Sequence, residues 1–204
     1  MKPQTLAQGA EAIIYKIDNK IVKDRIPKNY RIPEIDNKLR KGRTKSEAKI
    51  ISKLQKIIPV PRLLAMPGSE RMIHMQFIDG EKLSENLENL DYKKISKLIG
   101  KNIALMHDND IIHGDLTTSN MIYVEKEDKV YFIDFGLAFH SAKIEDKAVD
   151  LHLLQQALEA KHFTIEKECL KQILVEYEKK SKQGKLVLER IKVIESRGRY
   201  KDKY

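Results

Sequence analysis

The spacing of apolar residues changes near Gly80, and this change constrains the fold more than any other feature of the sequence. Before Gly80, short apolar runs alternate with turn-forming residues, which is typical of β-strands. After Gly80, apolar residues recur three and four positions apart, which is typical of helices with one buried face. Strands followed by helices predict an α+β protein built from two parts.

Strands are expected in the first part at 12–17, 20–24, 63–66 and 72–77. Asp18-Asn19 predicts a hairpin between the first two, because Asp and Asn tolerate left-handed turn conformations. Residues 25–43 are expected to be irregular, because they contain two X-Pro steps, which disfavour a helix at the preceding residue. Thr44 and Glu47 have the spacing of a capping box, so a helix is expected to begin near Thr44 and to end before Pro59.

Helices are expected in the second part at 91–109, 148–160, 164–180 and 186–195, and two short strands at 121–124 and 130–133. A total of 204 residues suits one compact domain or two small lobes. The single cysteine, Cys169, cannot form an internal disulfide and is expected to be a structural thiol in a reducing cytoplasm. We expect no membrane association, because no apolar run approaches the roughly 20 residues that span a bilayer and the N-terminus lacks a signal-peptide pattern.

The net charge of +9 is unevenly distributed. Residues 20–45 and residues 179–204 each hold ten Lys or Arg and three Asp or Glu, whereas the rest of the chain is net negative. Two basic segments predict contact with a polyanion such as ATP, RNA or an acidic protein face. Solvated lysine-rich faces, as in thermophilic proteins, are the alternative.

The chemistry is concentrated in the stretch HGDLTTSN, residues 113–120, and in IDFG, residues 133–136. Phosphoryl transfer needs a carboxylate to accept the proton of the attacking hydroxyl, and oxygen ligands that hold magnesium against the phosphates. Asp115 suits the first role, and Asn120 and Asp134 suit the second. A strand after the loop would deliver Asp134 to the same place. The pattern therefore predicts transfer of phosphate from Mg-ATP.

These motifs resemble the catalytic loop and the metal-binding motif of the protein-kinase superfamily. The chain is more closely similar to the small atypical kinase subunit of the KEOPS complex, the archaeal and eukaryotic assembly that makes threonylcarbamoyladenosine in tRNA. The stretches that carry this resemblance are QGAEA at 8–12, YRIPEID at 30–36, RTKSE at 43–47, IHGDLTTSN at 112–120, EDKAVDL at 145–151 and RGR at 197–199. They extend over almost the whole chain.

The resemblance implies a minimal bilobal protein-kinase-like fold with a small β-rich N-lobe and a reduced helical C-lobe. The boundaries would be 1–78 for the N-lobe, 79–196 for the C-lobe and 197–204 for a basic tail. It implies a serine/threonine kinase or ATPase that uses ATP and Mg²⁺. A small-molecule phosphotransferase of the aminoglycoside or choline kinase type, a RIO-type kinase of ribosome biogenesis and a pseudokinase scaffold are the alternatives.

The resemblance also assigns residues to the nucleotide. Lys23 would contact phosphate and pair with Glu47, although Lys16, Lys20 and Lys28 are rivals and Glu47 could instead be a capping residue. The remaining nucleotide contacts would be Gly9, Ala10, Glu11 and Ala12 over the phosphates, and Met75, Gln76, Phe77 and Ile78 along the adenine. Because like charges repel, the alternative for Glu11 is to fold over the cleft and pair with a basic residue.

Three departures from ordinary kinases change the expected substrate. Gly114 stands where regulated kinases carry arginine, and Thr117 where Ser/Thr kinases commonly carry lysine. Few residues separate Gly136 from Asp150, so a peptide-binding segment is missing. Asp150 resembles the aspartate that braces the catalytic loop, although a residue of a helix's first turn is the alternative.

The expected partners follow from the family. The threonylcarbamoyl-transferring KEOPS subunit would bind the C-lobe and the tail, and a small regulatory subunit would bind the N-lobe. The basic tail could also contact tRNA. A frayed terminus without function is the alternative for the tail.

Overall fold

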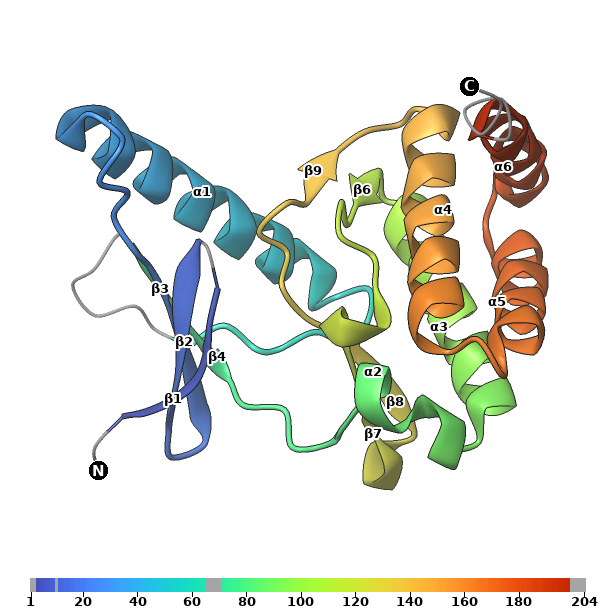
Figure 1. Cartoon of the computed structure of the whole chain (residues 1–204), viewed down its shortest axis with the longest axis horizontal. Helices are drawn as coiled ribbons and strands as arrows, with labels where there is room; N and C mark the ends of the chain where they lie inside the picture. The colour runs from blue at the N-terminus through green and yellow to red at the C-terminus, as the bar shows by residue number, and fades with distance from the viewer. Residues whose placement is uncertain (1–2, 10, 65–70, 199–204) are drawn as a thin grey trace. The chain divides into compact units, whose positions relative to one another are not determined.

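The computed structural model describes residues 3–9, 11–64 and 71–198. The chain divides into two compact units. Unit 1 comprises residues 1–56 and 60–79, and unit 2 comprises residues 57–59 and 80–204. Unit 1 holds a β-sheet and one long helix, whereas unit 2 is mainly helical (Figure 1). The chain is therefore α+β, as its sequence predicts.

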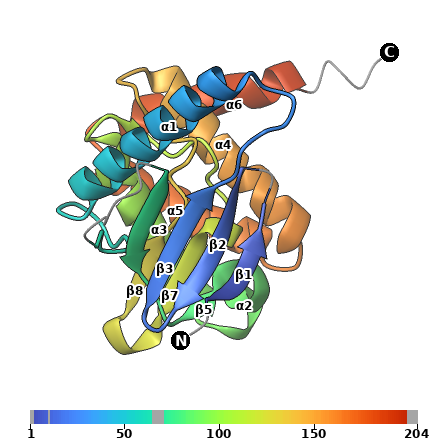
Figure 2. The same cartoon turned by 90° about the vertical axis from the view of Figure 1, so that its left-hand side faces the viewer.

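The sheet of unit 1 has four antiparallel strands in the order β1-β2-β3-β4 (Figure 2). They are β1 (Gln4–Gln8), β2 (Ala12–Ile17), β3 (Lys20–Arg25) and β4 (Met72–Gln76). The predicted hairpin joins β2 to β3, and Asp18 adopts the left-handed conformation with φ of 53°. The sequence did not predict β1, because all its residues are exposed and it has no apolar alternation.

Helix α1 (Pro33–Leu54) corrects two expectations. Residues 33–43 are helical rather than irregular, because Pro33 occupies the first turn, where its missing N–H has no intrahelical partner to lose. Thr44 lies in the middle of α1, so a capping box at Thr44 is wrong. The Thr44 hydroxyl is instead 3.4 Å from the Arg71 carbonyl oxygen.

The strand expected at 63–66 is also wrong in the part that the structure describes. Leu63 forms an isolated antiparallel bridge with Met75, and the amide of Leu64 donates to the His74 carbonyl oxygen at 2.8 Å. Residues 65 and 66 lie outside the described residues. Leu63 and Leu64 therefore lie beside β4 without forming a regular strand.

Unit 2 begins with β5 (Glu81–Lys82), α2 (Leu83–Asn86), the 3₁₀ turn η1 (Leu87–Asn89), α3 (Tyr92–His107) and β6 (Ile111–Ile112). There follow η2 (Thr118–Asn120), β7 (Met121–Val124), η3 (Glu125–Glu127), β8 (Lys129–Phe132), β9 (Phe139–His140), α4 (Ile144–Lys161), α5 (Glu166–Lys180) and α6 (Gly184–Gly198). The strands expected at 121–124 and 130–133 are confirmed as β7 and β8, which pair with each other. The two-residue strands β6 and β9 are too short to produce a sequence pattern.

The expected helices of unit 2 are present with shifted ends. Asp91 is the N-cap of α3 rather than its first residue, and its carboxylate accepts from the Lys94 amide at 3.1 Å. Helix α4 begins at Ile144, four residues before the expected start, because Glu145 and Asp146 occupy its first turn. No helix among the described ranges is long and apolar enough to cross a membrane.

The core of unit 2 forms where α3 packs against α5 (Figure 1). Ile95, Ile99 and Ile103 of α3 are completely buried. Cys169 of α5 is also buried, and this burial raises the pKa of its thiol, as expected of a structural cysteine. At Gly100 the helices approach so closely that a Cβ atom would lie 2.3 Å from the Ile173 carbonyl oxygen.

We expect the Gly100→Ala variant to lose about 1–3 kcal/mol of unfolding free energy, because the added methyl group would force α3 away from α5. Gly42→Ala is the matched control. Gly42 also lies within a helix, but a Cβ there meets no atom within 4 Å. The control variant should therefore gain roughly 0.5–1 kcal/mol from the higher helix propensity of alanine. Urea unfolding followed by circular dichroism measures both, and equal stabilisation would contradict the close approach.

Candidate active site

The loop between β6 and β7 brings Asp115 and Asn120 together. The side-chain amide of Asn120 donates to the backbone carbonyl oxygen of Asp115 and to its carboxylate Oδ2, both at 2.9 Å. The backbone amide of Asn120 donates to the Thr117 carbonyl oxygen at 3.0 Å. Because the Asn120 nitrogen is used inside the loop, its Oδ1 is the atom suited to a cation. The predicted proximity of Asp115 and Asn120 is therefore present.

Asp134 follows β8 and is tied to the same loop through its neighbour. The backbone amide of Ile133 donates to the Asn120 carbonyl oxygen at 3.0 Å. Asp134 has a φ of 60°, which is uncommon for a residue other than glycine. Its carboxylate Oδ1 accepts from the Gly136 amide at 3.2 Å, which supports this conformation locally. The chain therefore turns sharply at Asp134 and exposes it beside Phe135, which is buried.

His113 is a buried link between the loop and β8. Its Nδ1 accepts from the Asp115 amide at 3.3 Å, and its Nε2 is 3.2 Å from the Ile133 carbonyl oxygen. Burial lowers the pKa of the imidazole more than the charges of Asp150, Asp134 and Asp115 raise it. His113 is therefore neutral near pH 7, with its hydrogen on Nε2, where it can donate to Ile133.

Asp150 of α4 braces the loop, as its sequence context predicts. Its Oδ2 accepts from the His113 amide at 2.8 Å, and its Oδ1 accepts from the Gly114 amide at 2.9 Å. His107 lies 3.2 Å from the same Oδ2. Burial would raise the pKa of the Asp150 carboxyl, but its interactions with His107 and His113 together outweigh burial and hold this pKa below its usual value. Because α4 begins at Ile144, the first-turn alternative is wrong.

The structure of the loop explains why position 114 is a glycine. Gly114 has a φ of +78°, and a Cβ there would lie 2.5 Å from the Leu137 carbonyl oxygen. Both the conformation and the contact exclude a larger side chain. The arginine that regulated kinases carry at this position could not be accommodated by the loop.

Unit 1 holds the other group of predicted residues. Lys23 of β3 donates to the Glu47 carboxylate at 2.7 Å, so the expected ion pair is present. Arg25 donates to the other oxygen of Glu47 at 2.5 Å. All three side chains are at most 8% exposed. The sequence did not single out Arg25, although its place two residues after Lys23 puts both on one face of the strand.

A second buried pair supports this cluster. Arg40 of α1 donates through Nε to Asp36 at 2.6 Å and through a terminal nitrogen to the Arg25 carbonyl oxygen at 3.2 Å. Arg40 therefore links Asp36 to the strand that carries Lys23 and Arg25, the two cations that share the Glu47 carboxylate. Cationic side chains of this kind are the groups that bind phosphate in proteins.

The segment expected to cover phosphates lies between β1 and β2. The Gly9 amide donates to the Ala12 carbonyl oxygen at 3.0 Å, and Ala10 lies outside the described residues. Glu11 accepts from Arg43 at 2.6 Å, which confirms the expected basic partner. Burial would raise the pKa of the Glu11 carboxyl, but the Arg43 hydrogen bond and charge outweigh it and lower this pKa.

The amides of Gln76 and Phe77, which are expected along the adenine, have partners in unit 1. The Gln76 amide donates to the Arg62 carbonyl oxygen at 2.9 Å, and the Phe77 amide donates to the Asn19 carbonyl oxygen at 3.2 Å. Met75 and Ile78 are buried.

The structure also separates Lys23 from its rivals. The ammonium group of Lys16 lies 3.6 Å from the centre of the Phe77 ring, and Lys20 is exposed. Lys28 lies before α1 in an irregular segment, where its sequence context placed it. Among these lysines, Lys23 is the buried one that is paired with Glu47.

The oxygen donors of unit 2 suit a magnesium ion that is shared with phosphate. They are the exposed carboxylate of Asp134 and the amide oxygen of Asn120, and the exposed carboxylate of Asp115 is hydrogen-bonded to Asn120. Within the described ranges, no cluster of three or more His, Cys, Asp and Glu side chains could hold a metal ion. Magnesium in nucleotide sites takes only one or two protein carboxylates and completes its shell with phosphate and water. The donor set therefore fits Mg²⁺ bound with ATP.

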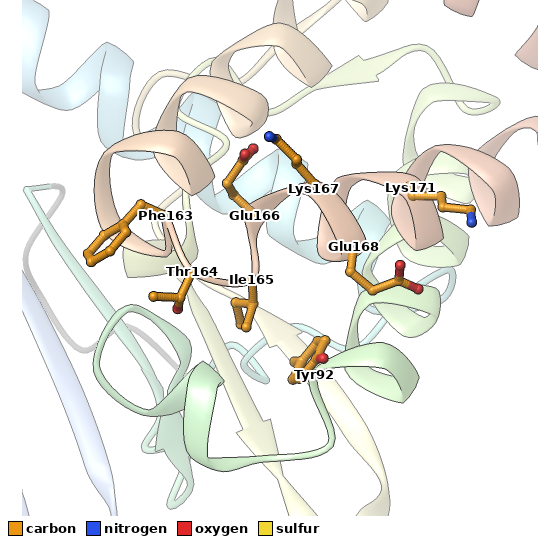
Figure 3. Close-up of a pocket in the computed structure, with 8 residues that line it drawn as sticks. All are labelled: Tyr92, Phe163, Thr164, Ile165, Glu166, Lys167, Glu168 and Lys171. Atoms are coloured by element: carbon orange, nitrogen blue, oxygen red, sulfur yellow. The ribbon is translucent and has the colours of Figure 1, made fainter.

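A surface pocket of about 400 Å³ lies at the start of α5 (Figure 3). Its lining includes Tyr92 of α3, Phe163 and Ile165, with Glu166, Glu168 and two lysines of α5. None of Asp115, Asn120 and Asp134 lines it. The pocket is therefore not the candidate active site.

Comparisons with known proteins identify the family of the chain. The RIO domain family model matches residues 15–151. The KEOPS complex subunit Bud32 of Pyrococcus abyssi is 42% identical over 97% of this chain and 96% of its own length. A probable serine/threonine-protein kinase BUD32 homolog of Archaeoglobus fulgidus is 39% identical over 94% of each chain.

A longer relative contains a similar sequence as one part. It is the probable bifunctional tRNA threonylcarbamoyladenosine biosynthesis protein of Methanobrevibacter smithii, which is 44% identical over 96% of this chain. This chain spans 36% of that protein's length. The near-complete coverage of the shorter relatives and the RIO domain match lead to one assignment: the chain belongs to the Bud32 family of RIO-domain, kinase-like proteins.

Proposed function

We propose that this protein is an atypical serine/threonine kinase and ATPase that uses Mg-ATP within a KEOPS complex, in the threonylcarbamoyladenosine modification of tRNA. The observation that carries the proposal is the hydrogen-bonded pair of Asp115 and Asn120, with Asp134 tied to Asn120 through Ile133. The names of the relatives supply the complex and the tRNA modification.

In this proposal Asp115 accepts the proton of the attacking hydroxyl or water. Asn120 orients the Asp115 carboxylate through its amide nitrogen and offers Oδ1 to magnesium. Asp134 supplies the second oxygen ligand. When bound, the magnesium ion would neutralise charge on the phosphates. Thr117 adds no cation to the loop, so further charge stabilisation would come from a partner chain.

The cluster of Lys23, Arg25 and Glu47 would hold the phosphates. Because Arg25 also binds Glu47, this carboxylate stays paired when Lys23 turns to a phosphate oxygen. Met75, Gln76, Phe77 and Ile78 would line the adenine, with the Ile78 amide as a candidate donor. Gly9, Ala10, Glu11 and Ala12 would lie near the phosphates, where the pairing of Glu11 with Arg43 removes its repulsion.

The partners are assigned by the same proposal. The threonylcarbamoyl-transferring subunit would bind unit 2 and the tail at 197–204. A small regulatory subunit would bind unit 1. The basic segments 20–45 and 179–204 would supply contacts to tRNA, and the site of action would be the cytoplasm.

The Asp134→Ala variant should turn over ATP at least about 100-fold more slowly, because it loses a magnesium ligand that acts on developing charge. Asp128→Ala is the matched control, since Asp128 also has a positive φ, of 52°, but lies at the other end of β8. Release of labelled phosphate measures both variants. Full activity of Asp134→Ala would remove the kinase assignment.

The Lys23→Met variant should lower kcat/KM for ATP by about 100-fold. Without Lys23, Arg25 would be the remaining cation of the cluster to balance both Glu47 and the phosphates. Lys20→Met changes an exposed lysine of the same strand and should stay close to the parent protein. Initial rates over a range of ATP concentrations separate the two. Equal loss in both variants would mean that Lys23 has no special role.

ATP hydrolysis should rise when the threonylcarbamoyl-transferring subunit is added, because the short segment after Gly136 leaves few residues for a peptide substrate. The assay compares this chain alone, with the subunit and with an unrelated protein of similar size. No stimulation, together with rapid turnover of an aminoglycoside, would favour a small-molecule phosphotransferase.

A further inference from the structure

A buried histidine that the proposed mechanism does not use contacts the loop of Asp115 and Asn120. His162 follows α4 and is 1% exposed. Its Nε2 lies 3.0 Å from the hydroxyl oxygen of Thr118, and its Nδ1 lies 2.6 Å from the Glu88 carboxylate. Thr118 is also 1% exposed, whereas Glu88 reaches the surface with a side chain that is 35% exposed. The three residues therefore form a chain from the loop to the surface.

The Glu88 carboxylate determines which imidazole nitrogen carries the hydrogen. An ionised carboxylate can only accept hydrogen bonds, so Nδ1 of His162 must be the donor in the 2.6 Å contact. Nε2 is then directed at the Thr118 hydroxyl. A carboxylate that fixes the tautomer and the ring orientation of a functional histidine is a recurring arrangement in protein sites.

Thr118 is well placed to control Asn120. It is the first residue of η2, and Asn120 is the last. The Thr118 carbonyl oxygen accepts from the Met121 amide, which closes this turn. Between Asp115 and Asn120, Leu116 and Thr118 are the buried side chains, so an apolar and a polar group anchor the loop. Movement of Thr118 would therefore tilt the turn that orients the Asn120 side chain.

The His162 side chain is not needed to end α4. The backbone amide of His162 donates to the Leu158 carbonyl oxygen at 2.7 Å, and the His162 carbonyl oxygen accepts from the Ile165 amide at 3.0 Å. The helix end is thus satisfied by the main chain. The imidazole is engaged only with Glu88 and Thr118 among the contacts of the described residues.

We propose that His162 is a positioning residue that holds the Thr118 hydroxyl, and through η2 the Asn120 oxygen, in the geometry that binds magnesium. Glu88 keeps the imidazole in the required tautomer. The inference rests on the proposed function, since it assigns Asn120 to the metal. Residues that act behind a metal ligand typically change metal affinity by about 10–100-fold.

The test compares Thr118→Val with Thr118→Ser. Valine keeps the shape of threonine but removes the hydroxyl, whereas serine keeps the hydroxyl. We expect Thr118→Val to raise the magnesium concentration for half-maximal ATP turnover by about tenfold, with KM for ATP at saturating magnesium almost unchanged. Thr118→Ser should restore the parent value. A hydroxyl with a purely structural role would not change the magnesium requirement selectively.

A second readout does not depend on activity. Calorimetric titration of the full chain with magnesium, in the presence of a non-hydrolysable ATP analogue, should show the same loss for Thr118→Val. His162→Gln should show a comparable loss, and the double variant should be no worse than either single variant, because both remove one interaction. His152→Gln is the matched control, since the buried Nδ1 of His152 has no hydrogen-bond partner among the described residues.

Glu88→Ala provides a second test in case a substitution of the buried Thr118 or His162 prevents folding. Glu88 is partly exposed, so its truncation leaves no buried cavity, and it should raise the magnesium requirement in the same direction as Thr118→Val. Unchanged magnesium affinity in folded Thr118→Val and Glu88→Ala would overturn the positioning role. Failure of the proposed function looks different: the parent protein would not hydrolyse ATP, or Asp134→Ala would remain fully active.

Discussion

The buried carboxylate of Asp150 accepts hydrogen bonds from two consecutive amides, those of His113 and Gly114. His113 is buried and Gly114 is partly buried, so leaving both amides without partners would be costly. The carboxylate is itself stabilised by His107, and His107 is held by the Tyr177 hydroxyl of α5 at 2.9 Å. The position of the loop that carries Asp115 thus depends on helices that come later in the chain.

The same loop is held from two further sides by imidazoles. His113 connects its first half to β8, and His162 connects its second half to Glu88. Each ring has one nitrogen directed to the loop and the other to a partner outside it. Because each imidazole joins the loop to a second partner, the side chains of Asp115, Asn120 and Asp134 can keep a defined geometry although the strands of unit 2 are short.

In unit 1 the central feature is a buried carboxylate that is shared by two cations. Glu47 is buried with two cations, Lys23 and Arg25, which bind different oxygens of its carboxylate. Arg40, which is paired with Asp36, holds the backbone of Arg25. A phosphate group could therefore bind Lys23 without leaving Glu47 unpaired, since Arg25 remains.

The sequence by itself determined the short-range features of this protein. The spacing of Asp115 and Asn120 places them in one loop, the apolar run before Asp134 predicts its strand, and Asp18-Asn19 between two apolar runs predicts the hairpin. Only the tertiary structure decided the role of Pro33, because an X-Pro step can either interrupt a helix or begin one. It also revealed the links of His162 to residues 44 and 74 positions away. Hydrogen bonds over such separations depend on how helices pack, and no local pattern of residue types encodes them.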